Sequence, residues 1–203
     1  MKKKIALILI TAMLLGVNVT GCSREIDGDN GEERETRAAV TRDPNDRPIP
    51  ILDEDEQVVI SFNAAGLTDE MLATKISTGE IPSNTTHLSL RNNSLTDISP
   101  LAEFADLIEL SLSGNQISVL PPLSGMESLA SLNLLSNQIT DISPLTELPS
   151  IMVLHLQNNQ IDDISPLTEI DTLTVVNVFN NPIDNTQLEE VRATLTNTTI
   201  STG

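Results

Sequence analysis

The stretch LASLNLLSNQITDISPLTELPS, from Leu129 to Ser150, decides the fold of this chain. It is one of a series of units of equal length, because an asparagine recurs every 22 residues along the sequence. A fixed period of about 20–50 residues indicates a repeat architecture, in which each unit forms one coil and neighbouring coils stack. The recurring asparagines are Asn93, Asn115, Asn137, Asn159 and Asn181.

The first half of each unit has the pattern of a strand with one buried face. With Leu129 counted as position 1, apolar residues occupy positions 1, 4 and 6, and around position 4 they alternate with polar ones. Position 9 is the asparagine, and we expect its buried amide to bond to the backbone of its own coil and of the next. The core columns at positions 1, 4 and 6 are Thr85, Leu88 and Leu90; Leu107, Leu110 and Leu112; Leu129, Leu132 and Leu134; Ile151, Leu154 and Leu156; and Leu173, Val176 and Val178.

The second half of the first four units continues the apolar pattern and adds a helix-start signal, whereas the fifth unit breaks the pattern after Ile183. Positions 11, 14, 17 and 20 are apolar and complete a continuous predicted interior. Proline occupies position 16 in four units, at Pro100, Pro122, Pro144 and Pro166, and serine precedes three of them. We expect this serine to cap a short 3₁₀ turn, or a one-turn helix, on the outer side of the coil.

The strand motif, the asparagine column and the strings TDISPL (Thr96–Leu101, Thr140–Leu145) and DDISPL (Asp162–Leu167) resemble the 22-residue leucine-rich repeats of the bacterial internalin family. The resemblance covers Thr85 to Leu195. It implies an α/β leucine-rich repeat solenoid of five repeats with helical caps, with short parallel strands on the concave side and 3₁₀ or short helical turns on the convex side. It also implies binding without catalysis. Internalins carry more repeats, and this sequence has no LPxTG sorting motif, so we do not carry over the invasion role of some internalins.

The N-terminus has the pattern of a secretory signal. Lys2, Lys3 and Lys4 precede an apolar run from about Ile5 to Val17, which is too short to span a bilayer comfortably. The following Val19-Thr20-Gly21-Cys22 resembles a bacterial lipobox, which implies lipidation of Cys22, the sole cysteine, by fatty acids such as palmitate. The alternative is an ordinary signal peptide with an incidental cysteine.

Composition shifts divide the chain. Residues 23–56 are polar and charged with almost no apolar clusters, which predicts a disordered tether. We therefore expect a lipoprotein signal peptide at 1–21, the lipidated cysteine and tether at 22–56, an N-terminal cap at 57–84, leucine-rich repeats at 85–185 and a C-terminal cap at 186–203.

Both predicted caps contain helix signals, because a solenoid without caps exposes its core at each end. A strand at Val58–Phe62 precedes a helix that ends near Ser77, with Thr68 as N-cap and Leu67 packed onto Leu72. Downstream, the helical spacing of apolar residues from Leu188 to Leu195 predicts a second helix. We expect Thr186 to cap this helix, and Thr198–Ser201 to add a closing strand.

The charge balance excludes some partners. Removal of residues 1–21 takes three lysines and no acids from a chain with 11 basic and 29 acidic residues, which lowers the net charge from −18 to −21. Beyond residue 56 the cations are Lys75, Arg91 and Arg192. We therefore expect no nucleic-acid partner and no direct contact with anionic lipid. The acids on the outer side of the coils, such as Asp141 and Glu147, are interpreted as a solvated face.

Positions 3, 5 and 7 of each strand are predicted to point away from the core and to form the partner-binding surface. Apolar residues at these positions gather in the later repeats, where Phe179 is one of three aromatics in the chain. Two interpretations of Phe179 stay open, a binding anchor and a residue that supports the C-terminal cap. The candidate partner-binding residues are His87, Arg91, Glu109, Asn133, Leu135, Val153, His155, Gln157, Val175, Asn177 and Phe179.

The sequence does not predict an enzyme. His87 and His155 fall on strands three places apart, too far to share one zinc ion, and each is interpreted as an exposed histidine. We expect no catalytic residue, metal or cofactor. The predicted protein is a monomeric lipoprotein in the bacterial cell envelope, extracytoplasmic and anchored to the membrane through Cys22, on the cell membrane or the outer membrane. Its concave face would bind a protein, or a glycan. The alternative is a structural component that helps to assemble an envelope complex.

Overall fold

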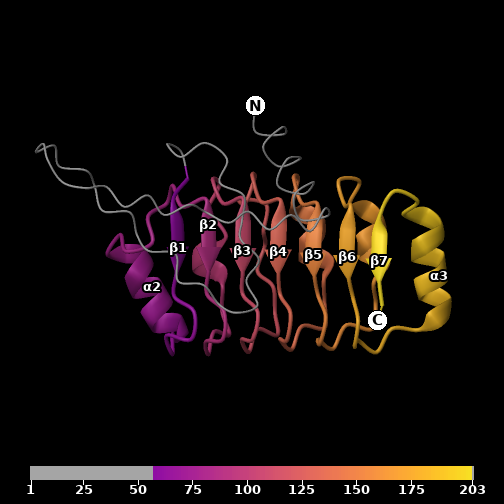
Figure 1. Ribbon diagram of the computed structural model, residues 1–203, viewed down its shortest axis with the longest axis horizontal. Coiled ribbons are helices and arrows are strands. Elements are labelled where there is room, and N and C mark those ends of the chain that lie inside the picture. Colours follow the sequence, from indigo (N-terminus) through magenta and orange to yellow (C-terminus); the bar gives the residue numbers. More distant parts are fainter. Residues whose placement is uncertain (1–56, 203) are drawn as a thin grey trace, which may run out of the picture.

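The computed structural model describes residues 57–202, so the predicted signal peptide, Cys22 and tether lie outside the described residues. Within that range, seven short strands form one parallel sheet in chain order (Figure 1). Helix α2 lies at one end of the row of strands and helix α3 at the other, which confirms the predicted α/β solenoid with helical caps. The strands are β1 (Val59–Ser61), β2 (His87–Ser89), β3 (Glu109–Ser111), β4 (Ser131–Asn133), β5 (Val153–His155), β6 (Val175–Asn177) and β7 (Thr199–Ser201).

The strands pair in register at equal repeat positions. Leu110 pairs with Leu132, and Leu132 with Leu154, so position 4 of every coil meets position 4 of the next. These three leucines are buried, which confirms the predicted inward face. The apolar positions of all coils join in one hydrophobic cluster that runs from Leu67 to Val191.

Four asparagines of the column are buried and Asn181 is half-buried, and their amides are bonded as predicted. In Asn137, Nδ2 donates to the carbonyl oxygens of Leu134 in its own coil (3.0 Å) and Leu112 in the preceding coil (3.1 Å). Its Oδ1 accepts the N–H of Ile117 in the preceding coil (3.0 Å). The same three bonds recur at Asn115, Asn159 and Asn181, so this column connects successive coils edge to edge.

Three coils have the predicted 3₁₀ turn: η1 (Ser99–Leu101), η2 (Ser143–Glu147) and η3 (Ser165–Glu169). The predicted capping role of serine is wrong, however. Ser143 is the first residue of its turn, and both its N–H (2.8 Å) and its hydroxyl (2.7 Å) donate to Oδ1 of Asp141. The aspartate two residues earlier already supplies the acceptor that the first N–H needs, so the hydroxyl becomes a second donor.

The second repeat, residues 107–128, lacks the turn that Pro122 predicted. Val119 stands where other units have the aspartate and Pro121 where they have the serine, so both partners of the start signal are missing. Pro121 also precedes Pro122, and a residue before proline avoids helical geometry. The next coil compensates. Oε2 of Glu147 accepts the N–H groups of Leu123 (2.9 Å) and Ser124 (3.2 Å). This exposed glutamate therefore holds the neighbouring coil, beyond the solvating role that we expected.

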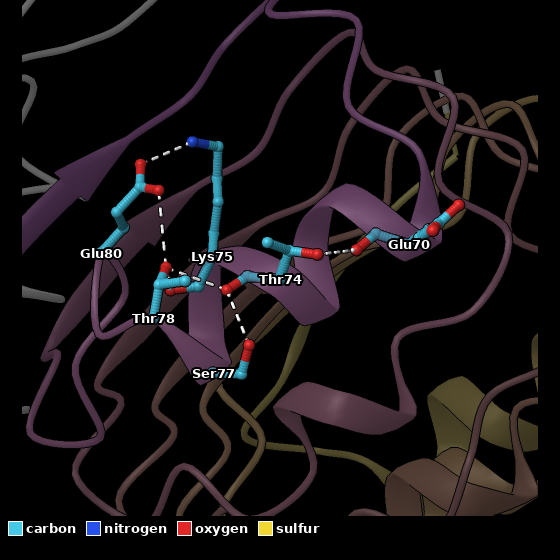
Figure 2. Close-up of polar contacts among 6 residues, drawn as sticks. All are labelled: Glu70, Thr74, Lys75, Ser77, Thr78 and Glu80. Carbon is cyan, nitrogen blue, oxygen red and sulfur yellow. Dashed lines mark hydrogen bonds and ion pairs between the residues drawn. The ribbon is translucent and has the colours of Figure 1, made fainter.

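The N-terminal cap follows the sequence closely. Helix α2 (Asp69–Ser77) begins after Thr68, whose side chain accepts the N–H of Met71, and both Leu67 and Leu72 are buried. Figure 2 shows how the helix ends: the hydroxyl of Thr78 donates to the Thr74 carbonyl, and Nζ of Lys75 contacts Oε2 of Glu80 at 2.7 Å.

The C-terminal cap differs from the prediction at its start. Helix α3 (Asn185–Thr194) has Asp184 as its N-cap, and the Asp184 carboxylate accepts the N–H of Thr186 at 2.7 Å. Thr186 is therefore inside the first turn. Asp184 is the better cap because a carboxylate there also interacts favourably with the helix dipole. Strand β7 closes the sheet as expected.

Candidate functional site: the concave face of the sheet

The concave face carries the side chains at positions 3, 5 and 7 of each coil. Positions 4 and 6 point into the core, and alternation along a strand turns positions 3, 5 and 7 the other way. The register continues beyond the short strands, since the N–H of Ser136 donates to the Gln157 carbonyl and that of Asn158 to the Phe179 carbonyl. Side chains at equal positions therefore form rows that cross the sheet, with neighbours about 4.8 Å apart.

The first rows of this face, over β2 and β3, hold its charged residues. Arg91 is half-buried, and its Nε donates to the hydroxyl of Ser113 at 3.0 Å. Glu109 is half-buried beside His87 in the register. The structure thus brings these three predicted site residues together at the N-terminal half of the face.

The exposure predicted for His87 is wrong, because only 2% of this residue is accessible. The ring lies in a row between Val59 and Glu109, and its Nδ1 is 2.9 Å from the hydroxyl of Thr86. Close lateral neighbours remove it from solvent. Burial lowers its pKa to about 4, so the ring is neutral at pH 7.

The other eight predicted site residues lie together over β4, β5 and β6. With Ser131 they form a grid of three residues on each of three coils, and none of the nine is an acid, a lysine or an arginine. Burial lowers the pKa of His155, so it too is neutral at pH 7. We call these nine residues the uncharged window: Ser131, Asn133 and Leu135; Val153, His155 and Gln157; Val175, Asn177 and Phe179.

Two members of the window have contrasting exposure. Val153 is 3% exposed, which contradicts the prediction that it is available to a partner. It lies between Ser131 and Val175 in the register, and these neighbours cover it. Phe179 is 49% exposed, a high fraction for an aromatic ring. Apolar contact in this window therefore comes from Phe179, with the half-buried Leu135 and Val175.

Several polar groups in the window have no hydrogen-bond partner within residues 57–202. Oδ1 of Asn133 accepts the N–H of Leu135, and Oδ1 of Asn177 accepts that of Phe179, which leaves both Nδ2 groups without an acceptor in that range. Oε1 of Gln157 is buried and has no donor. A buried acceptor without a donor is uncommon in folded proteins, so Oε1 of Gln157 calls for a physical explanation. The two Nδ2 groups belong to half-buried side chains and stay accessible to water or to a ligand.

A second column, at position 8 along the edge of the concave face, was not predicted. Asn158 and Asn180 have positive φ angles of 56° and 55°, and Nδ2 of Asn180 donates to Oδ1 of Asn158 at 2.8 Å. The signal was present in the sequence, because asparagine and glycine are the residues that adopt positive φ most readily. The column is Asn92, Gly114, Ser136, Asn158 and Asn180.

Two further findings concern the described residues 57–202. No group of three or more histidine, cysteine, aspartate or glutamate side chains there lies close enough to hold a metal ion. No helix in that range is long and apolar enough to cross a membrane.

The comparisons with known proteins agree with this geometry. The sequence profile of leucine-rich repeats (two copies) matches residues 105–147. The crystal structure of internalin C2 from Listeria monocytogenes is 30% identical over 69% of this chain and 68% of that protein, with a TM-score of 0.50. No curated protein matches the chain.

Two more solved structures are similar over part of their length. An internalin, InlF, from Listeria monocytogenes is 32% identical over 59% of this chain, with a TM-score of 0.47. A leucine-rich repeat protein from Leptospira interrogans is 23% identical over 59% of this chain, with a TM-score of 0.49. This chain spans 41% of the first protein and 37% of the second.

Proposed function

Because the chain belongs to the internalin-like leucine-rich repeat family, we propose that it is a lipid-anchored surface protein that captures a partner on its concave face. The fold is typically a non-enzymatic interaction scaffold, and leucine-rich repeat domains generally bind proteins. A glycan is the second partner class that an uncharged face admits. The observation that carries the proposal is the 49% exposed ring of Phe179 at one corner of the uncharged window.

The exposure of Phe179 favours a binding anchor over a cap residue, since a cap residue stabilises the domain by burying its apolar surface. Phe179→Ala together with Val175→Ser should reduce capture of the partner on cells at least tenfold, measured by crosslinking. Val175 is chosen as the second position because it is half-buried, whereas Val153 beside it in the register is buried. The matched control is Val119→Ala, which shortens an apolar side chain that is 73% exposed and lies outside the window. Equal capture by both variants would refute the binding role, and a lowered melting temperature of Phe179→Ala alone would support the cap role.

The lipid anchor and the division of the chain are part of the same proposal, and they rest on the sequence. Labelling of cells with a palmitate analogue should mark the protein and should be lost in Cys22→Ser. Persistent labelling of that variant would contradict the anchor.

The surface location is tested by trypsin on intact cells. In the proposed tether Arg42 precedes Asp43, whereas Arg47 precedes proline and resists cleavage, so the released domain should begin at Asp43. The folded domain should resist, because Lys75 contacts Glu80, Arg91 bonds to Ser113, and Arg192 lies within α3. Protection of the whole protein would favour the assembly role inside the envelope.

A further inference from the structure

The middle row of the uncharged window is a line of hydrogen-bonding groups that crosses three coils. Asn133, His155 and Asn177 are consecutive partners in the register. Each asparagine keeps its oxygen turned back to its own coil and leaves its Nδ2 donor unused within residues 57–202. The ring of His155 also has no hydrogen-bond partner in that part of the chain. Gln157 follows this row two residues after His155, but its Oε1 is buried, so the accessible groups of the row are those of Asn133, His155 and Asn177.

The spacing of this row restricts the shape of a ligand. The row repeats at the strand separation, about 4.8 Å, perpendicular to the strands. A β-1,4-linked sugar chain is an extended ribbon that advances by nearly this distance per ring, and every ring presents hydroxyl groups that both donate and accept. One ring can therefore face each of Asn133, His155 and Asn177.

The chemistry of the window restricts the charge of a ligand. None of its nine residues carries a formal charge at pH 7, because eight are not ionisable and burial lowers the pKa of the ninth, His155. The side chains that flank His155 in the row are amides, and Val153 and Gln157, two residues before and after it, are also uncharged. A charged ligand would lose its hydration here without gaining an opposite charge. Phe179, beside Asn177 on the β6 coil, adds an exposed apolar ring of the kind that packs against the C–H face of a sugar.

We propose that the uncharged window binds a neutral β-1,4-linked polysaccharide that runs across β4, β5 and β6, with one sugar ring over each coil. This inference rests on the proposed function, which makes the concave face the binding face, and it names the class of partner. An extended peptide fits the row less well, since its groups on one side repeat at about 6.8 Å. An α-helix has no free backbone groups to offer, because its N–H and C=O groups bond to each other.

The test is isothermal titration calorimetry of the full chain with four hexasaccharides. Cellohexaose and chitohexaose are neutral and β-1,4-linked, maltohexaose is neutral but α-1,4-linked and curved, and hexagalacturonate is acidic. We expect binding of at least one of the two neutral β-1,4 chains, and at least tenfold weaker binding of maltohexaose and hexagalacturonate.

The deciding variants are Asn133→Asp and Asn177→Asp. Each keeps the shape of the side chain and the oxygen that accepts the N–H two residues later, and each loses the Nδ2 donor and gains a charge. Each should weaken binding of the neutral chain at least tenfold. The matched control is Asn197→Asp, which makes the same chemical change at an exposed position outside the window and should leave binding unchanged.

The outcomes separate this inference from the proposed function. Equal binding of maltohexaose or hexagalacturonate, or equal binding by Asn177→Asp and Asn197→Asp, would overturn the inference. A second outcome is that no hexasaccharide binds while cell-surface capture still depends on Phe179. This outcome would overturn the inference in favour of a protein partner and leave the proposed function standing. If the variant with Phe179→Ala and Val175→Ser keeps both hexasaccharide binding and cell-surface capture, the inference and the proposed function are both overturned.

Discussion

The asparagine column provides the sharpest test of how this fold is held together. The perturbation is Asn137→Ala, which removes one amide from the middle of the column and changes no apolar contact of the strand. Asn137 is 8% exposed, so water does not replace the lost bonds readily. Four hydrogen bonds disappear: three short ones, to Leu134, Leu112 and Ile117, and a long one to the Leu135 carbonyl (3.5 Å).

The partners of the three short bonds do not cost the same. The carbonyl of Leu112 keeps the Nδ2 donor of Asn115 at 2.8 Å, and that of Leu134 keeps the donor of Asn159 at 3.0 Å. The N–H of Ile117 loses its partner altogether. A typical hydrogen bond contributes about 1 kcal/mol net, and a buried orphan donor costs about 1–3 kcal/mol. With two bonds lost at the carbonyls and one N–H orphaned, we expect a loss of about 3–5 kcal/mol.

The assay is urea unfolding followed by far-ultraviolet circular dichroism, because the chain contains no tryptophan and no tyrosine for fluorescence. With a slope of about 2 kcal/mol per molar urea, the midpoint should fall by about 1.5–2.5 M. The adjacent Gln138→Ala changes an exposed side chain and should alter stability by less than about 0.5 kcal/mol. The half-buried Asn181 ends the column, so Asn181→Ala should cost less than Asn137→Ala. The reasoning is refuted if Asn137→Ala costs no more than Gln138→Ala, or no more than Asn181→Ala.

Three further predictions follow from particular contacts. Gly114 has a φ of +69°, and a Cβ there would collide with Oδ1 of Asn92, so Gly114→Ala should lower the free energy of unfolding by about 1–2 kcal/mol. Asn92→Gly should recover part of this loss in a double-mutant cycle, and strictly additive effects of the two substitutions would contradict the collision. Glu147→Ala frees the N–H groups of Leu123 and Ser124 and should cost about 1 kcal/mol by urea unfolding. Glu169→Ala, at the same repeat position in the next coil, should be neutral, and equal effects would show that Glu147 does not hold the second repeat. The pKa of His87 is about 4 in the folded protein and about 6.5 in the unfolded chain, so the unfolded state binds more protons between these values and stability falls as the pH drops from 6.5 to 4. The loss in the free energy of unfolding should approach about 3 kcal/mol and should be absent in His87→Gln. If His87→Gln keeps the same pH dependence of stability, another titrating group causes it.

The regular columns of this solenoid could be predicted from the sequence because each is enforced by the same contact in every coil. Leu132 is buried because Leu110 and Leu154 occupy the same position on either side. The buried amide of Asn137 finds partners because the coils before and after it have the same backbone. Periodicity therefore predicts both the interior and the direction of the concave face.

The irregular features could not be predicted, because each depends on a contact between different positions of neighbouring coils. The missing turn of the second repeat is compensated by Glu147, which lies in another coil and at another repeat position. The burial of His87 depends on residues from β1 and β3 that flank it in the sheet. A pattern within one unit contains no information on such contacts.

The candidate site illustrates why exposure alone is a poor guide to function in this fold. Asp141 is exposed, yet its carboxylate is occupied by Ser143, and these hydrogen bonds lower its pKa. Asn133 and Asn177 are half-buried, yet each has an Nδ2 donor that is unused within residues 57–202. A partner gains little from a group that already has its hydrogen bonds, and it gains more from a group that lacks them. A partner therefore gains less from outer acids such as Asp141 than from the uncharged window of the sheet.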